Sequence, residues 1–459
     1  MQTAFNAYFE SLRGKRIAVL GLGVSNRPLV RLLLSFGCTV TGCDRTPREK
    51  LDEEVLELEA KGCKLSLGDT YLDDITADVV FRTPGMHPGN SAIVKLRDSC
   101  AKITSEMEVF FELCKCNTIA VTGSDGKTTP TTLVSELLKA EGKTVWLGGN
   151  IGTPLLSFLP EMQEEDFAVV ELSSFQLMDM ERSAQRAVIT NLSPNHLDVH
   201  KDMDEYIEAK KNVYKYQNSE GLLVVNADNA ITAPLLGNGE IRYFSRRIKP
   251  ENGVYLENGT IYRVKNGVSE AVMPMETILL PGIHNVENYM TAIAVTDGLV
   301  SDETIRHVAA TFGGVEHRIE LVRVKDGVRY YNDSIASSPS RTIAGLRSFP
   351  EQVILIAGGY DKHIPFDVLG PEVCRHVKKL YLTGATAQKI YDAVVSCPDY
   401  TVGKPEIEVI DDFSETVHAA ASFAKEGDVV LLSPACAAFD KFKNFMVRGK
   451  FFKKLVQEL

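Results

Sequence analysis

The chain has 459 residues and a mass of 50.6 kDa, which is more than one ordinary hydrophobic core supports. At about 150 residues per domain, this length predicts about three domains. Apolar residues make up 44% and charged residues 24%, as in globular proteins, which excludes a disordered or fibrous chain. The 61 acidic residues outnumber the 50 basic ones. Because a net charge of -11 disfavours general binding to phosphate backbones, we expect no nucleic-acid partner.

Short apolar runs alternate with segments of helical periodicity along the whole chain, which is typical of parallel α/β sheets. In the first section, strands are predicted at 16–20, 38–41 and 79–81. In the second section, strands are predicted at 118–121, 144–147, 167–172, 187–191 and 222–226, followed by hairpin-like stretches at 251–267 and a helix from about Val286. In the third section, strands separated by helices are predicted at 328–332, 353–357, 379–382 and 429–432.

The signals of the three sections differ, and we place the boundaries near 107 and 313, where Gly313-Gly314 follows a helical segment. The expected α/β fold has three domains. They are a Rossmann-like domain at 1–107, a central phosphate-loop ATPase domain with a mostly parallel sheet at 108–313, and a Rossmann-like domain at 314–459. Ligands of such sheets bind at the carboxyl ends of the strands, where this chain places many small or polar residues, so each section is expected to hold a site.

No apolar run approaches the roughly 18 residues that a membrane span needs, so we expect no membrane partner. The first residues include Glu10 and lack the apolar core of a signal peptide, which predicts a cytoplasmic protein. The nine cysteines are scattered. Cys114 and Cys116 form a C-x-C, but no pair of C-x-x-C motifs indicates a zinc site. We therefore expect reduced, mostly buried thiols.

The strongest local signal is Thr122-Gly-Ser-Asp-Gly-Lys-Thr-Thr129, between a predicted strand and a predicted helix. Its glycines let the backbone wrap around an anion, and the helix N-terminus directs N–H groups towards it. Lys127 is expected to reach the β and γ phosphates of a nucleotide, and the Thr128 hydroxyl to reach Mg²⁺. Because Val121 stands where a strict motif begins with Gly, this is a shortened phosphate loop.

Two further strand ends of the second section carry candidate functional residues. Glu171 ends a predicted strand, where a carboxylate suits a Mg²⁺ that neutralises nucleotide phosphates. Asn191-Leu-Ser-Pro-Asn-His-Leu-Asp198 follows another strand. Within it, His196 is a functional candidate because it shares this section with Lys127 and Glu171.

The first section carries a weaker nucleotide signal. Gly21-Leu-Gly-Val-Ser-Asn26 follows the first strand, and Asp44 ends the next, 21 residues after Gly23. This nearly matches the dinucleotide fingerprint with its ribose-binding acid, although Asn26 replaces the third Gly. The turn predicts binding of a nucleotide diphosphate and leaves the base open.

Five further motifs accompany these signals: Leu280-Pro-Gly-Ile-His-Asn-Val-Glu-Asn288, Glu316-His-Arg318, Tyr331-Asn-Asp-Ser334, Gly358-Gly-Tyr-Asp-Lys362 and Leu432-Ser-Pro-Ala-Cys-Ala-Ala-Phe-Asp-Lys-Phe-Lys-Asn-Phe445. In this order, over essentially the whole chain, the motifs resemble the Mur ligase family, ATP-dependent amino-acid ligases of peptidoglycan precursor synthesis. The last motif is similar to the signature of the D-glutamate-adding members. The resemblance implies that ATP phosphorylates the carboxylate of UDP-N-acetylmuramoyl-L-alanine, and that D-glutamate then attacks the acyl phosphate. It also implies Mg²⁺ as a cofactor, and we expect a monomer.

The resemblance implies three sets of binding residues, carried over position by position. The set for the UDP-sugar is Val24, Ser25, Asp44, Arg45, Asn150, Ser173 and Gln176. The set for ATP is Gly123, Ser124, Asp125, Gly126, Lys127, Thr128, Thr129, Asn285, Asn288, Arg318 and Asp333. The set for D-glutamate is Ser337, Lys362, Phe439 and Phe445.

The implied catalytic residues are Lys127, Glu171, His196 and Lys210, and the implied metal ligands are Thr128, Glu171, His196 and Lys210. Lys210 matches a family lysine that is modified to a carbamate. A carbamate would present oxygen ligands to Mg²⁺ where an ammonium would repel it. Its neighbour Lys211 is expected to point about 100° away around the helix.

Three departures from the family pattern stand out. Asp125 replaces the usual Asn of the phosphate loop, and its negative charge should weaken ATP binding unless Mg²⁺ or Lys127 offsets it. Ile335 replaces a Lys, and Ala438 replaces a Ser, so the expected D-glutamate pocket lacks a cation and a hydroxyl.

Three alternative functions are open at this point. The first is another ligase of the superfamily, such as a folylpolyglutamate synthetase, which the nucleotide-binding turn of the first section and the 433–445 segment disfavour. The second is a nicotinamide-dependent dehydrogenase, which leaves the phosphate loop unexplained and lacks the third Gly of the fingerprint. The third is a phosphate-loop switch or binding protein without ligase chemistry.

Overall fold

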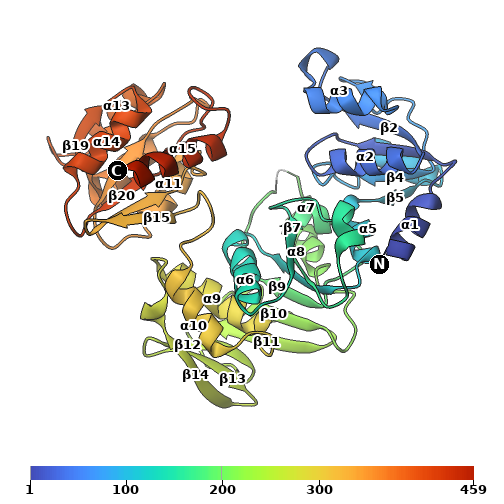
Figure 1. Cartoon of the computed structure of the whole chain (residues 1–459), viewed down its shortest axis with the longest axis horizontal. Coiled ribbons are helices and arrows are strands. Elements are labelled where there is room, and N and C mark those ends of the chain that lie inside the picture. Colours follow the sequence, from blue (N-terminus) through green and yellow to red (C-terminus); the bar gives the residue numbers. More distant parts are fainter. Residues whose placement is uncertain (1, 198) are drawn as a thin grey trace. The chain divides into compact units, whose positions relative to one another are not determined.

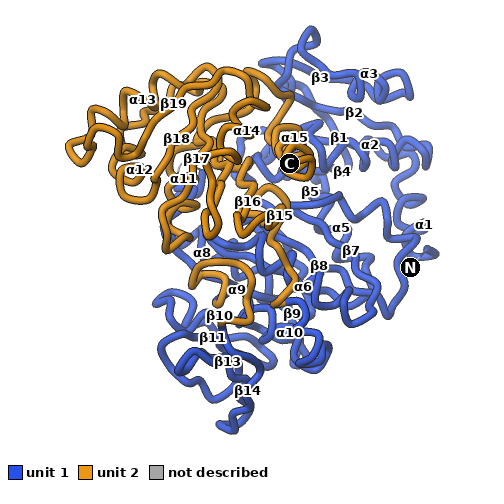
Figure 2. Tube along the Cα trace, turned by 60° about the vertical axis from the view of Figure 1, so that its left-hand side comes forward, with its two compact units in different colours: residues 1–275, 287–308 blue, residues 276–286, 309–459 orange. Residues whose placement is uncertain are grey.

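The computed structural model of the protein describes residues 2–197 and 199–459. Two compact units are distinguished in Figure 2: unit 1 comprises residues 1–275 and 287–308, and unit 2 comprises residues 276–286 and 309–459. Over the described residues, unit 1 contains a five-stranded and a nine-stranded sheet, and unit 2 contains a six-stranded sheet. In this part of the chain, no helix combines the length and the apolar character needed to cross a membrane.

The first sheet of unit 1 is parallel throughout, with the strand order β3-β2-β1-β4-β5. Figure 1 labels β2, β4 and β5 of this sheet, and Figure 2 labels all five strands. Strand order reverses at β1, so the turn after β1 lies at a topological switch point, where such sheets bind ligands. The strands are β1 (Arg16–Leu20), β2 (Thr39–Asp44), β3 (Lys64–Leu67), β4 (Val79–Arg82) and β5 (Lys102–Thr104). The helices of this section are α1 (Gln2–Glu10), α2 (Asn26–Ser35), the short η1 (Arg48–Lys50), α3 (Glu53–Ala60) and α4 (Ser91–Asp98).

The second sheet has the order β14-β13-β12-β11-β10-β9-β6-β8-β7. It is parallel except for the pairs β12–β13 and β13–β14. Strand β6 lies between β8 and β9, so the loop after β6 also lies at a switch point. The strands are β6 (Asn117–Thr122), β7 (Val145–Gly149), β8 (Phe167–Glu171), β9 (Arg186–Ile189), β10 (Leu222–Asn226), β11 (Glu240–Ser245), β12 (Gly253–Glu257), β13 (Thr260–Lys265) and β14 (Val268–Pro274).

Some of the helices that follow the first sheet begin at residues whose side chains cap the first turn. Ser105, Ser173 and Asp202 each accept a hydrogen bond from a backbone N–H of the first turn, which fixes the start of a helix. The helices that follow the first sheet are α5 (Glu106–Leu113), α6 (Thr128–Ala140), η2 (Leu156–Glu161), α7 (Ser174–Leu177), α8 (Met203–Lys211), η3 (Met275–Thr277), α9 (Ile283–Thr296) and α10 (Asp302–Thr311).

One hydrophobic core joins the two sheets of unit 1. The cluster contains Phe9 of α1, Leu33 of α2, Leu159 of η2 and Val170 of β8, and each of these four side chains has no exposed area. Apolar burial is the main favourable term in folding. The first and second sheets therefore stabilise one another through a shared core, and the site residues of both sheets are held by it.

The sheet of unit 2 has the order β15-β16-β20-β17-β18-β19, and only the pair β15–β16 is antiparallel. Alternate residues of β17 enter two hydrophobic clusters, with Leu355 in one and Ile354 in the other, as expected of a sheet covered on both faces. The strands are β15 (Glu320–Lys325), β16 (Val328–Asn332), β17 (Val353–Ala357), β18 (Val377–Leu382), β19 (Glu406–Val409) and β20 (Val429–Leu432). The helices are α11 (Pro339–Leu346), η4 (Asp367–Leu369), α12 (Gly370–His376), α13 (Ala387–Val395), α14 (Phe413–Phe423) and α15 (Phe445–Glu458).

The expected α/β class with three mostly parallel sheets is confirmed. The buried apolar strands β1, β10, β16, β17 and β20 lie where the sequence predicts them. Strands such as β3 and β19, whose residues are only partly buried, were not predicted because they lack an apolar run. Helix α9 begins at Ile283 rather than near Val286. The boundaries at 107 and 313 stay predictions.

A buried carboxyl makes the stability of unit 1 depend on pH. Glu106 is 7% exposed, and its Oε1 accepts a hydrogen bond of 3.1 Å from the Leu156 amide. Burial raises the pKa of Glu106 to about 7. Between pH 4.5 and about 7 the unfolded chain loses this proton while the folded chain keeps it, so the free energy of unfolding falls as the pH rises.

We predict that Glu106→Gln removes this loss, which amounts to about 3 kcal/mol for the full shift. The variant should gain stability relative to the parent between pH 5 and pH 8, as measured by urea unfolding at both values. Replacement of the exposed Glu10 by Gln is the control and should follow the parent. A parent and a Glu106→Gln variant with parallel pH dependence would contradict the prediction.

Candidate active site

The phosphate loop lies between β6 and α6, at the switch point of the second sheet. Its backbone is held by the segment after β9: Ser124 N donates to Asn191 O at 2.9 Å, and Asp125 N donates to Asn191 Oδ1 at 3.0 Å. A Cβ on Gly123 would lie 2.0 Å from Thr190 Oγ1, so only glycine fits there. The loop is thus fixed in place by residues about 65 positions later in the chain.

The Lys127 side chain forms hydrogen bonds within the phosphate loop. Its Nζ donates to the carbonyl oxygens of Gly123 and Ser124, each at 3.1 Å. Thr128 begins α6 directly after it, so the N–H groups of the first turn and the Lys127 ammonium lie at the same place. This combination of cation, loop amides and helix N-terminus can bind a polyphosphate. The Asp125 side chain is exposed.

Glu171 ends β8 next to the phosphate loop, because it pairs with Val121 of β6. The side chain is 1% exposed, and Oε1 accepts a hydrogen bond of 2.7 Å from Asn150 Nδ2. The other oxygen, Oε2, is buried without a hydrogen-bond donor among the described residues. A buried carboxylate oxygen needs a partner, and a cation would satisfy it.

Lys210 of α8 approaches the same loop from the other side. Its Nζ donates to Gly123 O at 2.8 Å and to Thr122 Oγ1 at 3.2 Å, and it lies 4.9 Å from the centre of the Tyr206 ring. Burial, and then the charge of Lys127, lower the pKa of Lys210 well below its usual value. Lys211, in contrast, forms an ion pair with Glu208 at the surface, so the two neighbours differ as predicted.

His196 and His200 lie on either side of Phe175. His196 is exposed and packs edge-to-face on the Phe175 ring at 5.0 Å. His200 is buried, stacks on the same ring at 5.5 Å, and its Nε2 lies 2.9 Å from Ser174 Oγ. The sequence analysis missed His200, although it is placed four residues after His196, just before the cap of α8.

Mg²⁺ is the metal that the family resemblance implies. Among the described residues, no group of three or more His, Cys, Asp or Glu is arranged to hold a metal ion. Mg²⁺ does not require such a cage, since it binds through one or two carboxylates, substrate phosphates and water. The orphaned Glu171 Oε2 and the Thr128 hydroxyl at the start of α6 supply hard oxygen donors of this type. The residues present therefore fit Mg²⁺.

The turn after β1 is held by Asp44. Its carboxylate accepts hydrogen bonds from the amides of Leu22 at 2.7 Å and Thr46 at 2.9 Å. Burial opposes ionisation, but these backbone bonds outweigh it and lower the pKa of Asp44. Asn26, which stands in place of the third Gly, is buried and donates to Gly21 O at 2.9 Å. The departure at Asn26 thus reinforces the turn.

The other residues of the UDP-sugar set differ in exposure. Val24 is 75% exposed, and Arg45 is also exposed, so both side chains are open to a ligand. Ser173 and Gln176 form a capping box at α7, in which Ser173 Oγ lies 2.9 Å from Gln176 Oε1. Asn150 donates its side-chain hydrogen bond to Glu171 Oε1. Their roles towards a sugar nucleotide stay predictions.

Arg82 joins the two sheets of unit 1 and was missed by the sequence analysis. It ends β4, is 2% exposed, donates to Phe175 O at 3.2 Å and forms an ion pair with Asp179. His87, five residues later, lies 3.3 Å from Glu205 of α8. These contacts fix the first sheet to α7 and α8, the helix that carries Lys210. Arg82 also donates to the nearby Met86 O at 2.7 Å, but its partners on the second sheet's side, Phe175 and Asp179, lie more than ninety residues away, so no local motif marks it.

In unit 2, Asp333 follows β16 and is buried. Ser433, directly after β20, donates its Oγ to Asp333 Oδ2 at 2.7 Å. Burial raises the pKa of Asp333 to about 7. Arg318 is partly buried, and Asn285 Nδ2 donates to Pro281 O at 2.7 Å near the start of α9. Asn288, three residues further along α9, belongs to unit 1.

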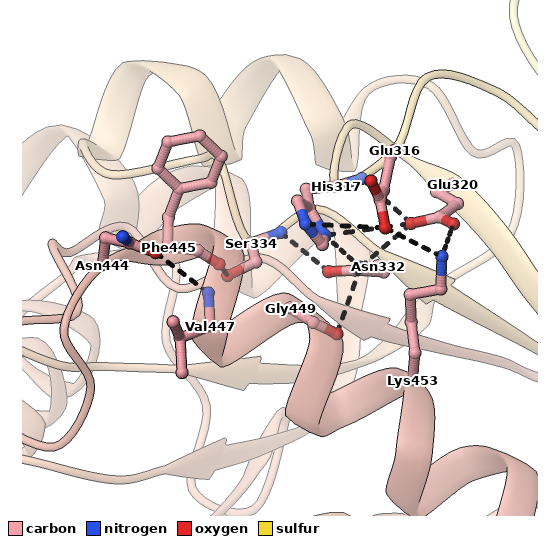
Figure 3. A network of polar contacts seen from close by, with 10 residues as sticks. All are labelled: Glu316, His317, Glu320, Asn332, Ser334, Asn444, Phe445, Val447, Gly449 and Lys453. Carbon is pink, nitrogen blue, oxygen red and sulfur yellow. Dashed lines mark hydrogen bonds and ion pairs between the residues drawn. The ribbon is translucent and has the colours of Figure 1, made fainter. Parts of the chain in front are cut away.

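A polar network in unit 2 fixes the start of α15 (Figure 3). The Asn332 amide lies 2.9 Å from His317 Nδ1 and donates to Glu320 Oε2 at 3.0 Å, while Glu320 pairs with Lys453 of α15. Ser334 Oγ donates to Phe445 O at 2.8 Å. The segment after β16 therefore sets the position of Phe445, one of the four residues implied to bind D-glutamate.

Arg448 fixes the signature segment that precedes α15. It is 2% exposed and donates to three carbonyl oxygens, Ser334 O at 2.9 Å, Cys436 O at 3.0 Å and Ala437 O at 3.1 Å. Within this segment, Phe439 is exposed and its ring lies 5.8 Å from that of Tyr360. The sequence analysis did not single out Arg448.

The remaining residues of the D-glutamate set are open to a ligand. Lys362 is exposed on the loop after β17, two residues from Tyr360, and Ser337 is partly buried before α11. Ile335 supplies no cation and Ala438 no hydroxyl, as expected from the sequence. The binding of an amino acid to these residues stays a prediction.

A phosphate-binding loop at the switch point of a mostly parallel sheet places the protein in the class of phosphate-loop α/β nucleotide-binding proteins. Models of known families identify it further: the Mur ligase middle domain matches residues 121–296, and the Mur ligase glutamate ligase domain matches residues 317–436. The chain belongs to the Mur ligase family. The resemblance seen in its motifs is thereby confirmed.

Relatives match over the full length. The UDP-N-acetylmuramoylalanine–D-glutamate ligase of Clostridium novyi (strain NT) is 50% identical over 463 residues, and that of Acetivibrio thermocellus is 48% identical over 465 residues, with all of each chain covered. Among solved structures, UDP-N-acetylmuramate-alanine ligase from Thermotoga maritima has a TM-score of 0.56 at 20% identity, covering 97% of this chain and 99% of that one. A UDP-N-acetylmuramoyl-L-alanyl-D-glutamate–2,6-diaminopimelate ligase has a TM-score of 0.57 at 18% identity, covering 92% and 93%. These structures share the fold.

We predict that Gly123→Ala weakens ATP binding by about tenfold or more, because the new methyl group overlaps Thr190 Oγ1 and must displace the loop. Isothermal titration with ATP measures the change. Gly85→Ala is the matched control, since a Cβ at Gly85 meets no atom within 4 Å. If Gly123→Ala and the parent bind ATP with equal affinity, the loop does not hold the nucleotide in the conformation that the structure shows.

Proposed function

We propose that this chain joins D-glutamate to UDP-N-acetylmuramoyl-L-alanine at the expense of ATP, forming an amide with release of ADP and phosphate. The observation that carries the proposal is the full-length similarity to relatives named for this reaction, at up to 50% identity. The site supports it, since a phosphate loop, a buried carboxylate and a buried lysine meet at the ends of β6 and β8.

The reaction needs a leaving group on the sugar nucleotide. A carboxylate is a poor electrophile, and transfer of the γ-phosphoryl group from ATP converts it to an acyl phosphate that an amine can attack. Charge spreads over the transferring phosphoryl group, and Lys127 is the cation of the loop that would stabilise it. Lys127 would do so by exchanging its bonds to Gly123 O and Ser124 O for phosphate oxygens.

We assign Mg²⁺ to Thr128, Glu171 and His196, with Lys210 as a carbamate. When bound, the ion supplies charge neutralisation to the phosphate and carboxylate oxygens. The Lys210 amine reacts with CO₂ only in its neutral form, and its burial beside Lys127 favours that form. His196, on its exposed turn, would have to move towards the ion, whereas Glu171 is already oriented by Asn150.

In unit 2, we assign recognition of D-glutamate to Lys362, Ser337, Phe439 and Phe445. With Ile335 and Ala438 in place of a cation and a hydroxyl, Lys362 carries a larger share of the attraction for the carboxylates. The main chain around Phe439 is held by Arg448, so its amides are available at fixed positions.

The direct test is phosphate release from ATP, measured with and without each co-substrate. Release should require both UDP-N-acetylmuramoyl-L-alanine and D-glutamate. Lys127→Ala should lower this rate by about 10²–10³ with an unchanged melting temperature, because a cation that stabilises the transferring group is lost. Phosphate release in the absence of both substrates would instead indicate a phosphate-loop switch.

A second prediction tests Lys210. Lys210→Ala should be nearly inactive, and short carboxylic acids should restore part of the rate by supplying the missing oxygens. Lys211→Ala, on the same helix but at the surface, is the control and should keep the parental rate. A Lys210→Ala variant that melts like the parent and is not rescued would contradict the carbamate.

A further inference from the structure

Two cysteines lie together where the chain passes from the first sheet of unit 1 to the second. Cys114 follows the last residue of α5, and Cys116 precedes Asn117, the first residue of β6. Their Sγ atoms are 3.0 Å apart, within hydrogen-bond distance for sulfur. Closing this gap to the about 2.05 Å of a disulfide needs a movement of about 1 Å.

The two thiols are not equivalent. Cys114 is partly exposed, whereas Cys116 is 1% exposed and belongs to the hydrophobic core of unit 1. The hydrogen bond between the two sulfurs lowers the pKa of the Cys114 thiol and raises the pKa of the Cys116 thiol. Because the thiolate is the nucleophile, Cys114 is the sulfur that reacts first and Cys116 the one that follows.

We propose that Cys114 and Cys116 form a reactive dithiol site that small disulfides, such as oxidised glutathione, convert to an intramolecular disulfide. This site is independent of the ligase chemistry proposed above. It rests on the contact between the two sulfurs, on their spacing in the chain and on the access to Cys114.

The reaction proceeds in two exchanges. The Cys114 thiolate attacks one sulfur of oxidised glutathione, which forms a mixed disulfide and releases one glutathione thiolate. Cys116 then gives its proton to that thiolate and attacks the Cys114 sulfur, which releases the second glutathione. Two protein thiols are oxidised and one small disulfide is reduced to two thiols, so atoms and electrons balance.

Other cysteines of the chain provide internal comparisons. Cys43 is completely buried, and burial, followed by the neighbouring Cys63, raises its pKa to about 12. Cys374 lies near Cys397, but burial and then this neighbour raise the pKa of Cys374 to about 11. Cys43 and Cys374 therefore hold less thiolate than Cys114 at neutral pH. Cys100 is exposed, so its rate of oxidation shows whether solvent access alone makes a cysteine reactive.

The experiment treats the native full-length protein with oxidised glutathione at neutral pH, traps free thiols by alkylation at intervals, and maps the cysteines by mass spectrometry. We expect a Cys114–Cys116 disulfide, about 2 Da lighter than the dithiol, at least about tenfold faster than oxidation of Cys374 or Cys43. Dithiothreitol should reverse it.

Two variants separate the roles of the sulfurs. Cys116→Ser should stop at the glutathione adduct of Cys114, and Cys114→Ser should leave Cys116 reduced over the same period. Cys100→Ser is the control and should form the disulfide at the parental rate. If Cys374–Cys397 or Cys43–Cys63 closes first, or if wild-type Cys114 stops at the glutathione adduct, the proposal is overturned.

Discussion

The candidate active site depends on one carbonyl oxygen, that of Gly123, which accepts hydrogen bonds from two lysines. Lys127 reaches it from the loop at 3.1 Å and Lys210 reaches it from α8 at 2.8 Å. Two ammonium groups cannot lie close together in a buried position without a cost, and burial, followed by the Lys127 charge, lowers the pKa of Lys210 well below its usual value. The burial of the Lys210 side chain and then the nearby charge of Lys127 therefore favour the neutral amine of Lys210.

The surrounding structure maintains this arrangement. Asp202 fixes the start of α8, and Glu205 of the same helix accepts a hydrogen bond from the Lys201 amide and contacts His87. Arg82 and the shared hydrophobic core hold the first sheet against the second. A change in the first sheet can thus alter the position of Lys210, although the two lie far apart in the sequence.

Much of the fold, and the residue types of the site, could be predicted from local patterns. The phosphate loop has a contiguous motif, and β10 and β17 are uninterrupted apolar runs, so each carries its own signal. His200, Arg82 and Arg448 carry no such signal, because their partners are carbonyl oxygens, hydroxyls and rings brought close only by folding. Arg448, for example, contacts Ser334 across 114 residues of chain. Burial of such a side chain is a property of the assembled sheet rather than of the adjacent sequence.

The bonds that Lys127 makes to its own loop have a consequence for the nucleotide cycle. In the proposed function, a triphosphate that enters the loop would compete with Gly123 O and Ser124 O for the Lys127 ammonium. Part of the attraction between the triphosphate and Lys127 would therefore be offset by the loss of these two hydrogen bonds, which re-form when the phosphate leaves. Such an exchange would lower the net affinity of the loop for the nucleotide. Under the proposed function, the loop would therefore hold fresh nucleotide less tightly and let a spent diphosphate leave more readily.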